Sequence, residues 1–261
     1  MAKRAGIARL VGAALFGAGA ILPASAAETY ERLFRPLAQM AAPYLHRKTD
    51  FFSGIDFSDA SAFAWMGVTY APAGTLIEDG WRIRFTGGAG RYTYRTTIVP
   101  GGVNDANVQT AELLGGYRKT FDNILGQRVY VGAFVGLNHE NQLLALPDPF
   151  NPTQGSATGA KAVLDLYARV SGHYILSGFA SISTVHRKYQ AKATLLHAWS
   201  PQWAFGIEAA TMGDARYSEN RAGLAASLTW NNRIISLSGG TLDNTGRGSG
   251  AYATLSVYAP F

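Results

Sequence analysis

Several side chains could act as nucleophile, base or acid, but their spacing matches no established catalytic motif. They are Ser181, Ser183, His139, His186, Glu140 and Asp148. A Ser-His-acid set near the rim of a folded domain is what a hydrolase or a lipid-modifying enzyme needs. The sequence has no Gly-x-Ser-x-Gly elbow that would present the serine. It therefore favours a protein without catalytic activity and leaves such an enzyme as an alternative.

The histidines and cysteines indicate neither a metal site nor a cofactor. Of the five histidines, only His139 has a carboxylate at close spacing, which is Glu140. No glycine-rich phosphate loop or dinucleotide fingerprint is present. Without any cysteine there is no disulfide framework, so stability must come from the fold itself. We expect no metal and no cofactor.

Charged residues recur at alternate positions of short segments, most clearly in 80–94. There large apolar residues alternate with Arg82, Arg84 and Thr86. A period of two predicts a β-strand with one apolar and one polar face. The charged residues that such alternation places on polar faces include Arg82, Arg84, Glu112, Lys161, Asp165, Arg169, Lys192 and Glu208.

These eight residues are the predicted lumen or substrate-path residues if the strands close into a membrane barrel. Hydrocarbon would not tolerate their charges, so the lumen is the expected place for them. Their mixed signs fit two arrangements. One is a closed interior held by salt bridges, and the other is a channel with a moderately positive path.

The last strand, 250–261, shows the same two-faced pattern. Alternate residues from Ala251 to Phe261 are apolar, and the residues between them include Tyr252, Thr254, Ser256 and Tyr258. A final strand that stops on an aromatic residue resembles those of outer-membrane β-barrels in Gram-negative bacteria. The pattern predicts that the apolar row faces lipid and the hydroxyl row faces the lumen.

Twelve such segments follow one another, which predicts an all-β fold: a transmembrane antiparallel up-and-down barrel of about 12 strands, with 10 or 14 as alternatives. The predicted strands are 51–57, 62–71, 80–94, 107–120, 128–140, 160–170, 175–185, 189–199, 203–212, 221–230, 233–241 and 250–261.

Short turns are predicted at 122–123, 200–202 and 231–232, and long loops at 100–106, 141–158 and 243–250. If short turns are periplasmic and long loops extracellular, the turn near Pro72 and the loop 141–158 lie at opposite ends, and the strand number is even. The glycine run 87–90 is a further irregularity, because polarity changes face there. It predicts either a β-bulge or a strand that leaves the membrane band.

The first 26 residues have the pattern of a secretory signal peptide. Lys3, Arg4 and Arg9 precede an apolar run, and Ala24-Ser25-Ala26 is a small-residue cleavage site. We expect Sec-type export and cleavage after Ala26. Residues 27–50 are expected to form a short helix or a disordered leader, and residues 51–261 the barrel domain.

Export also changes the charge argument. The chain has 23 Lys and Arg against 17 Asp and Glu, and removal of three basic residues with the signal leaves 20 against 17. The mature protein is only mildly basic, so no nucleic-acid partner is expected. The partner expected from the barrel pattern is outer-membrane lipid.

The loop after His139 carries the most individual sequence. It reads Leu-Pro-Asp-Pro-Phe-Asn-Pro from Leu146 to Pro152. Three prolines stiffen it, and stiff loops of this length are often functional. Asp148, Phe150 and Asn151 are therefore candidate extracellular binding residues.

Taken together, short motifs in a fixed order resemble the cellulose biosynthesis protein BcsS family, over roughly Phe51 to the C-terminus. The motifs are the strand pair 51–71, Asp-Gly-Trp-Arg-Ile-Arg from Asp79, Leu-Gly-Gly-Tyr from Leu114, Tyr-Val-Gly from Tyr130, the Asp-Pro-Phe-Asn-Pro loop and Gly-Ala-Lys from Gly159. The resemblance implies an exported outer-membrane barrel associated with bacterial cellulose synthesis, and it implies no catalytic residue.

Aromatic residues near predicted strand ends have two interpretations. They are Trp81, Tyr92, Tyr94, Trp199, Trp203 and Trp230. They fit the girdles at a membrane interface, and at a mouth they could instead stack on sugar rings. We expect girdle positions.

The leading functional hypothesis is a non-catalytic outer-membrane barrel of a Gram-negative bacterium that assists cellulose biosynthesis, export or assembly. Its partners would be cellulose, a β-glucan, and components of the synthase or secretion machinery. A narrow porin-like channel for small solutes or oligosaccharides is the alternative, and the hydrolase or lipid-modifying enzyme is the third.

Overall fold

The computed structural model describes residues 47–261 apart from 125–126 and 171. The predicted signal peptide and nearly all of the predicted leader lie outside these residues. Among the described residues, no helix has the length and apolar character to cross a membrane.

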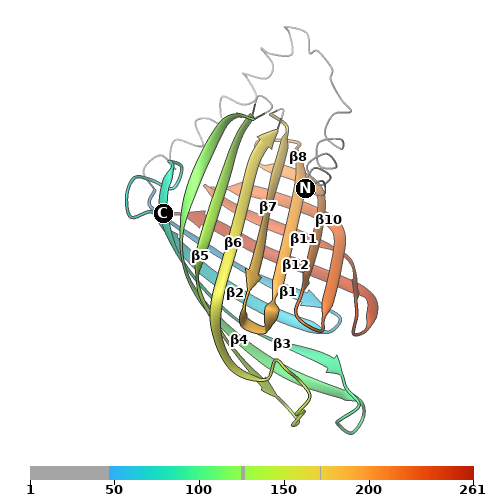
Figure 1. The fold of residues 1–261 in the computed structure, drawn as a ribbon. Helices are drawn as coiled ribbons and strands as arrows, with labels where there is room; N and C mark the ends of the chain where they lie inside the picture. Colours follow the sequence, from blue (N-terminus) through green and yellow to red (C-terminus); the bar gives the residue numbers. More distant parts are fainter. Residues whose placement is uncertain (1–46, 125–126, 171) are drawn as a thin grey trace, which may run out of the picture. The chain divides into compact units, whose positions relative to one another are not determined.

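Twelve antiparallel strands form one closed barrel (Figure 1). The strands are β1 (Thr49–Ser58), β2 (Ser61–Tyr70), β3 (Gly80–Arg95), β4 (Val103–Ile124), β5 (Gln127–Leu144), β6 (Gly155–Val170), β7 (Tyr174–Ser183), β8 (Tyr189–Ala198), β9 (Trp203–Gly213), β10 (Ser218–Trp230), β11 (Arg233–Asn244) and β12 (Gly248–Pro260). Each pairs with its sequence neighbours, and β1 closes the ring with β12. The predicted number of strands and the up-and-down order are confirmed.

Closure gives the backbone N–H and C=O groups of the last strand, β12, hydrogen-bond partners on both edges. Residues of β12 pair with β11 on one side and with β1 on the other, from Ser58 opposite Tyr252 to Asp50 opposite Pro260. The predicted faces are also confirmed, since Tyr252 and Thr254 are buried in the interior while Leu255 and Phe261 are exposed. A closed ring leaves no sheet edge, which a membrane barrel requires.

The two ends of the barrel differ. The terminal end is the one where β1 starts and β12 finishes, and there the amide of Phe261 donates to the carbonyl of Thr49 at 2.7 Å. The connections 71–79, 199–202 and 231–232 lie at this end. The opposite, loop end holds the connections 96–102, 145–154 and 214–217. The turn near Pro72 and the loop after β5 therefore lie at opposite ends, as predicted.

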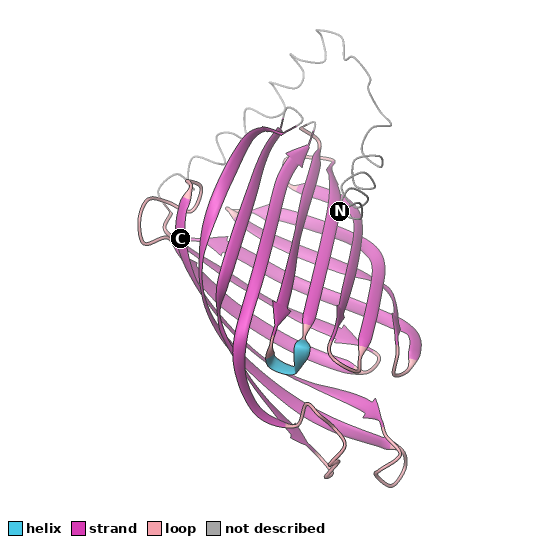
Figure 2. Cartoon of the chain, in the orientation of Figure 1, coloured by secondary structure: helices cyan, strands magenta, loops and turns pink. Residues whose placement is uncertain are grey.

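The wall is taller on one side. Strands β3 to β6 have 16, 22, 18 and 16 residues, whereas β7 and β8 have 10 each. The hairpins β3–β4 and β5–β6 consequently project at the loop end, as Figure 1 shows. In the described part of the chain the remaining regular element is a 3-10 turn, η2 (Val185–Arg187), between β7 and β8 (Figure 2).

This extra length corrects several predicted boundaries. Asp122 and Asn123 are not a turn, because β4 continues to Ile124 with an irregularity in its pairing after Phe121. The long loops also shrink, to 145–154 after β5 and 245–247 after β11. The predicted loops were too long because polar residues at strand ends are typical of loops, although a strand outside a membrane can be polar on both faces.

The glycine run 87–90 contains no β-bulge, so that prediction is wrong. Pairing of β3 with β2 and with β4 is continuous through these residues. The alternation of β3 continues unchanged, and only the residue types on its two faces differ. Beyond the glycines, Tyr92 and Tyr94 point inward and Arg91 and Arg95 point outward. The other interpretation, a strand that leaves the membrane band, stays a prediction.

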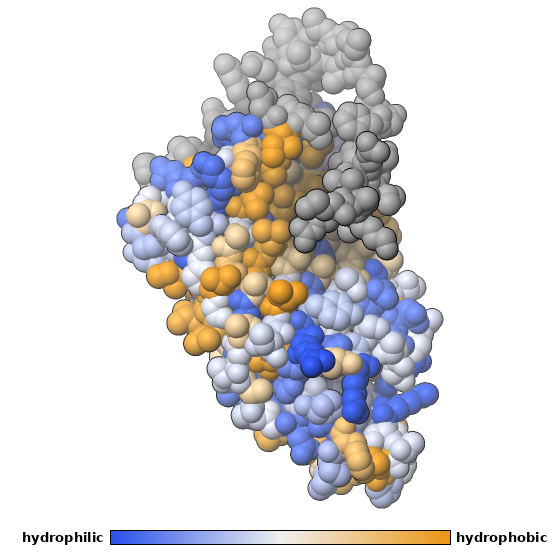
Figure 3. All heavy atoms as spheres, in the orientation of Figure 1, coloured by the Kyte–Doolittle hydropathy of each residue, from blue (hydrophilic) through white to orange (hydrophobic). Residues whose placement is uncertain are grey.

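The outer wall carries a belt of exposed apolar side chains. Its members include Met66, Phe85, Leu113, Val135, Leu137, Leu164, Ile182, Ile207, Leu224, Leu237 and Leu255. In Figure 3 apolar surface gathers on the visible wall away from the loop end, and polar surface covers the part nearer the loops. An apolar belt above a polar rim is the surface that a barrel of the outer-membrane type presents to lipid.

Candidate functional site

The strand register places all eight predicted lumen residues on the inward side of the wall. What they contact there differs. Most form ion pairs across the interior, Arg82 binds a loop, and Arg169 has no ion pair or hydrogen bond among the described residues. The lumen is therefore the candidate functional site.

Two ion pairs bridge β3, β4 and β6 inside the barrel. The Arg84 guanidinium lies 2.5 Å from the Asp165 carboxylate. Lys161 is hydrogen-bonded to Glu112, across the intervening strand β5. Arg84 also lies over the Phe134 ring, 4.0 Å from its centroid. These contacts link non-adjacent strands and neutralise charge that hydrocarbon could not cover.

A second group of charges lies on the other half of the wall. Lys192 Nζ is 2.7 Å from Glu208, and Glu208 also accepts a hydrogen bond from Ser238 at 3.0 Å. Arg221 binds Asp56 through two nitrogens, at 2.7 and 3.0 Å.

Arg221 and its partners Asp56 and Glu219 were missed by the sequence analysis. Glu219 lay just before the predicted start of its strand, and Asp56 in a short strand with no clear alternation. Arg221 and Glu219 are two positions apart and lie on the same, inward face of β10. This spacing was the sequence signal from which both could have been predicted.

Arg82 is not used as a charge partner. It is 2% exposed, and its guanidinium donates to the backbone carbonyls of Thr75 at 2.9 Å and Glu78 at 2.5 Å. Arg118 donates to the Leu76 carbonyl at 2.6 Å. Two inward arginines thus hold the connection 71–79 against the terminal end of the barrel.

The same connection is tied to β4 from outside. Asp79 lies 2.7 Å from Lys119 and accepts a hydrogen bond from the Thr120 amide at 2.6 Å. Hydrogen bonds from Lys119 and Thr120 lower the pKa of this exposed carboxyl to about 2.

The Pro-rich loop 145–154 folds over the loop end rather than standing free. Asp148 is buried and accepts a hydrogen bond from Tyr94 at 3.0 Å, and Asn151 accepts one from the Thr153 amide at 2.9 Å. Arg216, in the connection 214–217, donates to the Phe150 carbonyl at 3.2 Å. Asp148 and Asn151 therefore shape the loop, and only Phe150, 68% exposed, offers a free side chain.

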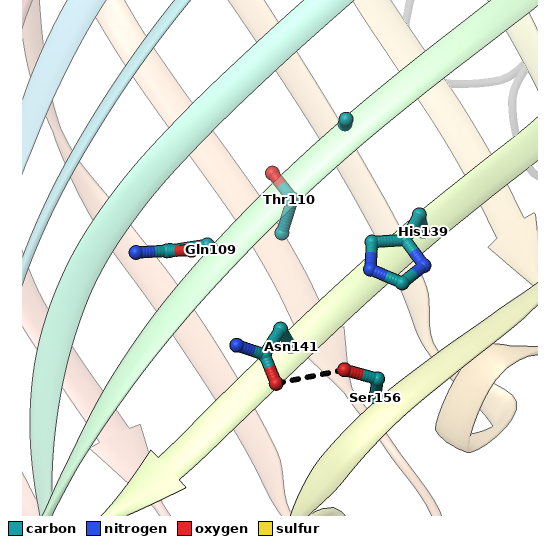
Figure 4. A pocket seen from close by; sticks show the side chains of 6 residues that line it. Gln109, Thr110, His139, Asn141 and Ser156 are labelled. Atoms are coloured by element: carbon teal, nitrogen blue, oxygen red, sulfur yellow. Dashed lines mark hydrogen bonds between the residues drawn. The ribbon is translucent and has the colours of Figure 1, made fainter.

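The residues of the hydrolase alternative are spread over different surfaces. His139 lies on the outward face, where its Nδ1 is 2.8 Å from Thr158 Oγ1. It lines a shallow pocket of about 290 Å³ with Gln109, Thr110, Ala111, Asn141 and Ser156, and Figure 4 shows the hydrogen bond between Asn141 and Ser156.

Glu140, next in sequence, faces the interior. It is 1% exposed, and Lys188 Nζ binds both its oxygens at 2.6 Å. Ser183 donates to Asn138 at 2.5 Å rather than to a histidine, and His186 Nε2 lies 3.8 Å from Glu140. In the described chain no serine is hydrogen-bonded to a histidine, so the geometry gives the alternative no support. The described residues also contain no group of three or more metal-ligating side chains.

The aromatic residues at strand ends separate into two sets. Trp81, Trp199, Trp203 and Trp230 are exposed and lie at the terminal end, which fits one girdle. Tyr92 and Tyr94 instead face inward, bonded to Gln142 at 2.6 Å and to Asp148 at 3.0 Å, so the girdle expectation for them is wrong.

Between the two groups of charges the lumen contains a cavity of about 340 Å³. Its inward-facing lining side chains are Phe52, Trp65, Asp165, Ser177, Phe179, Lys192, Thr194, Ile234, Ser236, Ser256 and Tyr258. Asp165 and Lys192 among them are predicted lumen residues, and Ser256 and Tyr258 belong to the hydroxyl row predicted to face the lumen. The other lining residues are uncharged and were not predicted.

The fold and the lumen define the class of protein: a closed 12-stranded β-barrel of the outer-membrane type with a polar, internally paired lumen. The chain belongs to the cellulose biosynthesis protein BcsS family, whose model matches residues 51–261. This match spans all the strands of the barrel except the first two residues of β1.

Comparison with solved structures gives more distant likenesses. The KdgM porin is similar with a TM-score of 0.49 and 9% identity, over 81% of this chain and 99% of that chain. The translocator domain of the autotransporter NalP from Neisseria meningitidis has a TM-score of 0.42 and 12% identity, over 94% of this chain and 100% of that chain. No curated protein matches the chain.

Proposed function

We propose that this protein is a non-catalytic outer-membrane barrel that assists the export or assembly of cellulose. The observation that carries the proposal is the family match over residues 51–261, because it covers the barrel itself. The protein would reach the membrane by Sec-type export, with cleavage after Ala26. Its partners would be the cellulose chain and components of the synthase or secretion machinery.

The lumen chemistry supports a neutral polymer as the cargo or ligand. Its acidic and basic side chains neutralise one another in pairs such as Arg84–Asp165, Lys192–Glu208 and Arg221–Asp56. A lumen with paired charges attracts neither anions nor cations strongly, whereas its hydroxyl groups remain able to bind sugar hydroxyls. The eight predicted lumen residues would then shape the path, and Phe150 would contact glucan outside.

A narrow channel for small solutes or oligosaccharides is the second candidate. The internal cavity of about 340 Å³ favours it, because side chains do not fill the barrel completely. Ion conductance by the purified barrel in a planar bilayer would support this candidate, and absence of conductance would count against it.

The proposal is tested by cellulose output from a strain that lacks the gene. Polymer outside the cell and polymer trapped in the periplasm are quantified separately. We expect external cellulose to fall and to return on complementation, with trapped polymer if export is the step assisted. If both pools match the parent under cellulose-producing conditions, the cellulose role is wrong.

A further inference from the structure

The inner wall of β1 and β2 carries a row of three aromatic rings, of which Phe52 also lies beneath the Arg84 guanidinium, with 5.9 Å between the guanidinium carbon and the ring centroid. Phe52 lies on β1, and Phe63 and Trp65 lie on β2, all on the inward side. Trp65 and Phe52 line the cavity of about 340 Å³, and Phe63 continues the row toward the loop end. We refer to Phe52, Phe63 and Trp65 as the aromatic strip.

Glycines opposite two of the rings leave room for them over the wall. A Cβ at Gly54 would overlap the Trp65 ring, and one at Gly67 would overlap the Phe52 ring. The Trp65 and Phe52 rings therefore occupy the space over the backbone where a neighbouring side chain would otherwise stand. Phe63 and Trp65 are nearly parallel, with an interplanar angle of 20° and centroids 6.5 Å apart. The rings of Trp65 and Phe52 both border the cavity.

The rest of the cavity wall is rich in hydroxyl groups. Ser177, Thr194, Ser236, Ser256 and Tyr258 come from β7, β8, β11 and β12 and point inward. The charged lining residues are already engaged, Asp165 with Arg84 and Lys192 with Glu208. The cavity thus combines an aromatic wall with neutral hydrogen-bonding groups and little unpaired charge.

This combination selects a class of ligand. Thr194 and Tyr258 already donate to Glu208 at 3.4 Å and to Asp50 at 3.3 Å. An apolar fatty ligand would leave the three serine hydroxyl groups without partners, and an ionic ligand would find little uncompensated charge. A pyranose with equatorial hydroxyl groups has an apolar C–H face that stacks on an aromatic ring and a polar rim that binds hydroxyl groups. β-Linked glucose units present such faces along a flat ribbon.

We propose that the aromatic strip and the hydroxyl groups opposite it form a binding site for a short segment of neutral β-linked glucan inside the lumen. Trp65 and Phe52 stack on sugar faces, and the serines and Thr194 bind the sugar rim. The inference rests on the proposed function, and it specifies the ligand class and the residues.

The test uses the complete mature barrel, purified in detergent, and cellohexaose as the probe. Binding is measured by calorimetry and by tryptophan fluorescence. Of the five tryptophans, Trp65 is the one that the strand register places inside, so quenching of its emission reports the lumen. We expect saturable binding to the unmodified protein, a loss of tenfold or more in Trp65→Ala, and a smaller loss in Trp65→Phe, which keeps a ring.

Trp81→Phe is the matched control, because Trp81 lies on the outward face and should leave affinity unchanged. Heat-modifiable migration on gels confirms that each variant is folded. Maltohexaose, which is α-linked and coiled, should bind at least tenfold more weakly than cellohexaose. The inference is overturned if the unmodified protein does not bind cellohexaose, or if folded Trp65→Ala and Trp65→Phe both bind it with unchanged affinity.

Complementation separates this inference from the proposed function. If the gene is required for external cellulose but the purified barrel binds no cellohexaose, the lumen site is wrong and the cellulose role stands. If Trp65-dependent binding is found but loss of the gene leaves cellulose unchanged, the site stands as a glucan site and the proposed function falls.

Discussion

Arg221 connects several charged and aromatic side chains of the interior. It binds Asp56 on β1 and Glu219 on its own strand, and its guanidinium lies 4.8 Å from the Tyr252 ring centroid. It thereby connects β10 to β1 across β11 and β12. Because all three charged groups are largely removed from solvent, each depends on the others for compensation.

Replacing Arg221 with methionine should therefore be costly. The change leaves Asp56 and Glu219 without their cation, and we expect a loss of about 3–5 kcal/mol in the free energy of unfolding. Arg128→Met is the control, since Arg128 and Asp122 form an exposed pair expected to contribute about 0–1 kcal/mol. Urea unfolding from lipid vesicles measures both variants. If both variants lost the same small amount of unfolding free energy, the contacts of Arg221 would not stabilise the barrel.

At the scale of elements, the connection 71–79 is held on two sides. Arg82 and Arg118 bind its carbonyls from inside, and Lys119 and Thr120 bind Asp79 from β4. Its backbone is also tied to the start of β1, where the Ala71 amide donates to the Lys48 carbonyl at 2.8 Å. This is the longest connection at the terminal end, and its contacts make it part of the fold.

The contacts of Asp79 with Lys119 and Thr120 should weaken in acid. Its pKa is about 2 in the folded protein against 3.8 ordinarily, so the contact stabilises the folded state above about pH 4 and loses its contribution as pH falls toward 2. A carboxyl-carbon NMR titration should give a midpoint near 2, and Lys119→Ala should raise it. A midpoint at the ordinary value in the unmodified protein would contradict the ion pair.

At the scale of the whole molecule, the apolar side chains on the outward face of the closed barrel determine where it contacts lipid. The exposed apolar belt passes through the middle of the shorter strands, and Leu224 of β10, 73% exposed, is one of its most exposed members. On the taller side, the outward residues near the loop end include the polar Asp105, Asn107 and Gln109 of β4, with the apolar Val103 and Leu143 among them. The projecting hairpins therefore extend past the apolar belt.

Arginine substitutions can locate the membrane band. Leu224→Arg should lower the free energy of unfolding from lipid by about 2–4 kcal/mol, because it puts a charge near the middle of the belt. Asn107→Arg, also outward but on the projecting part of β4, should change it by about 0–1 kcal/mol. Similar losses for the two variants would show that the belt does not coincide with the hydrocarbon.

The sequence alone determined most of the fold. Its period of two does not depend on distant contacts, because successive side chains of a strand point to opposite faces. Alternation therefore identified the strands, the lipid-facing row of β12 and the inward direction of all eight charged candidates. It failed at strand ends such as Asp122, where β4 continues to Ile124 through polar residues that are typical of turns.

Only the tertiary structure decided which inward residues meet. Arg84 and Asp165 are far apart in sequence, and their 2.5 Å contact depends on how the strands curve into a ring. The same holds for Arg82, which binds backbone carbonyls of the connection 71–79, and for Asp148, which accepts a hydrogen bond from Tyr94 and so holds its own loop in place. Trp65 became a candidate ligand contact because Gly54 of the neighbouring strand lies under its ring, and cross-strand register of this kind is fixed by pairing and closure, not by local sequence.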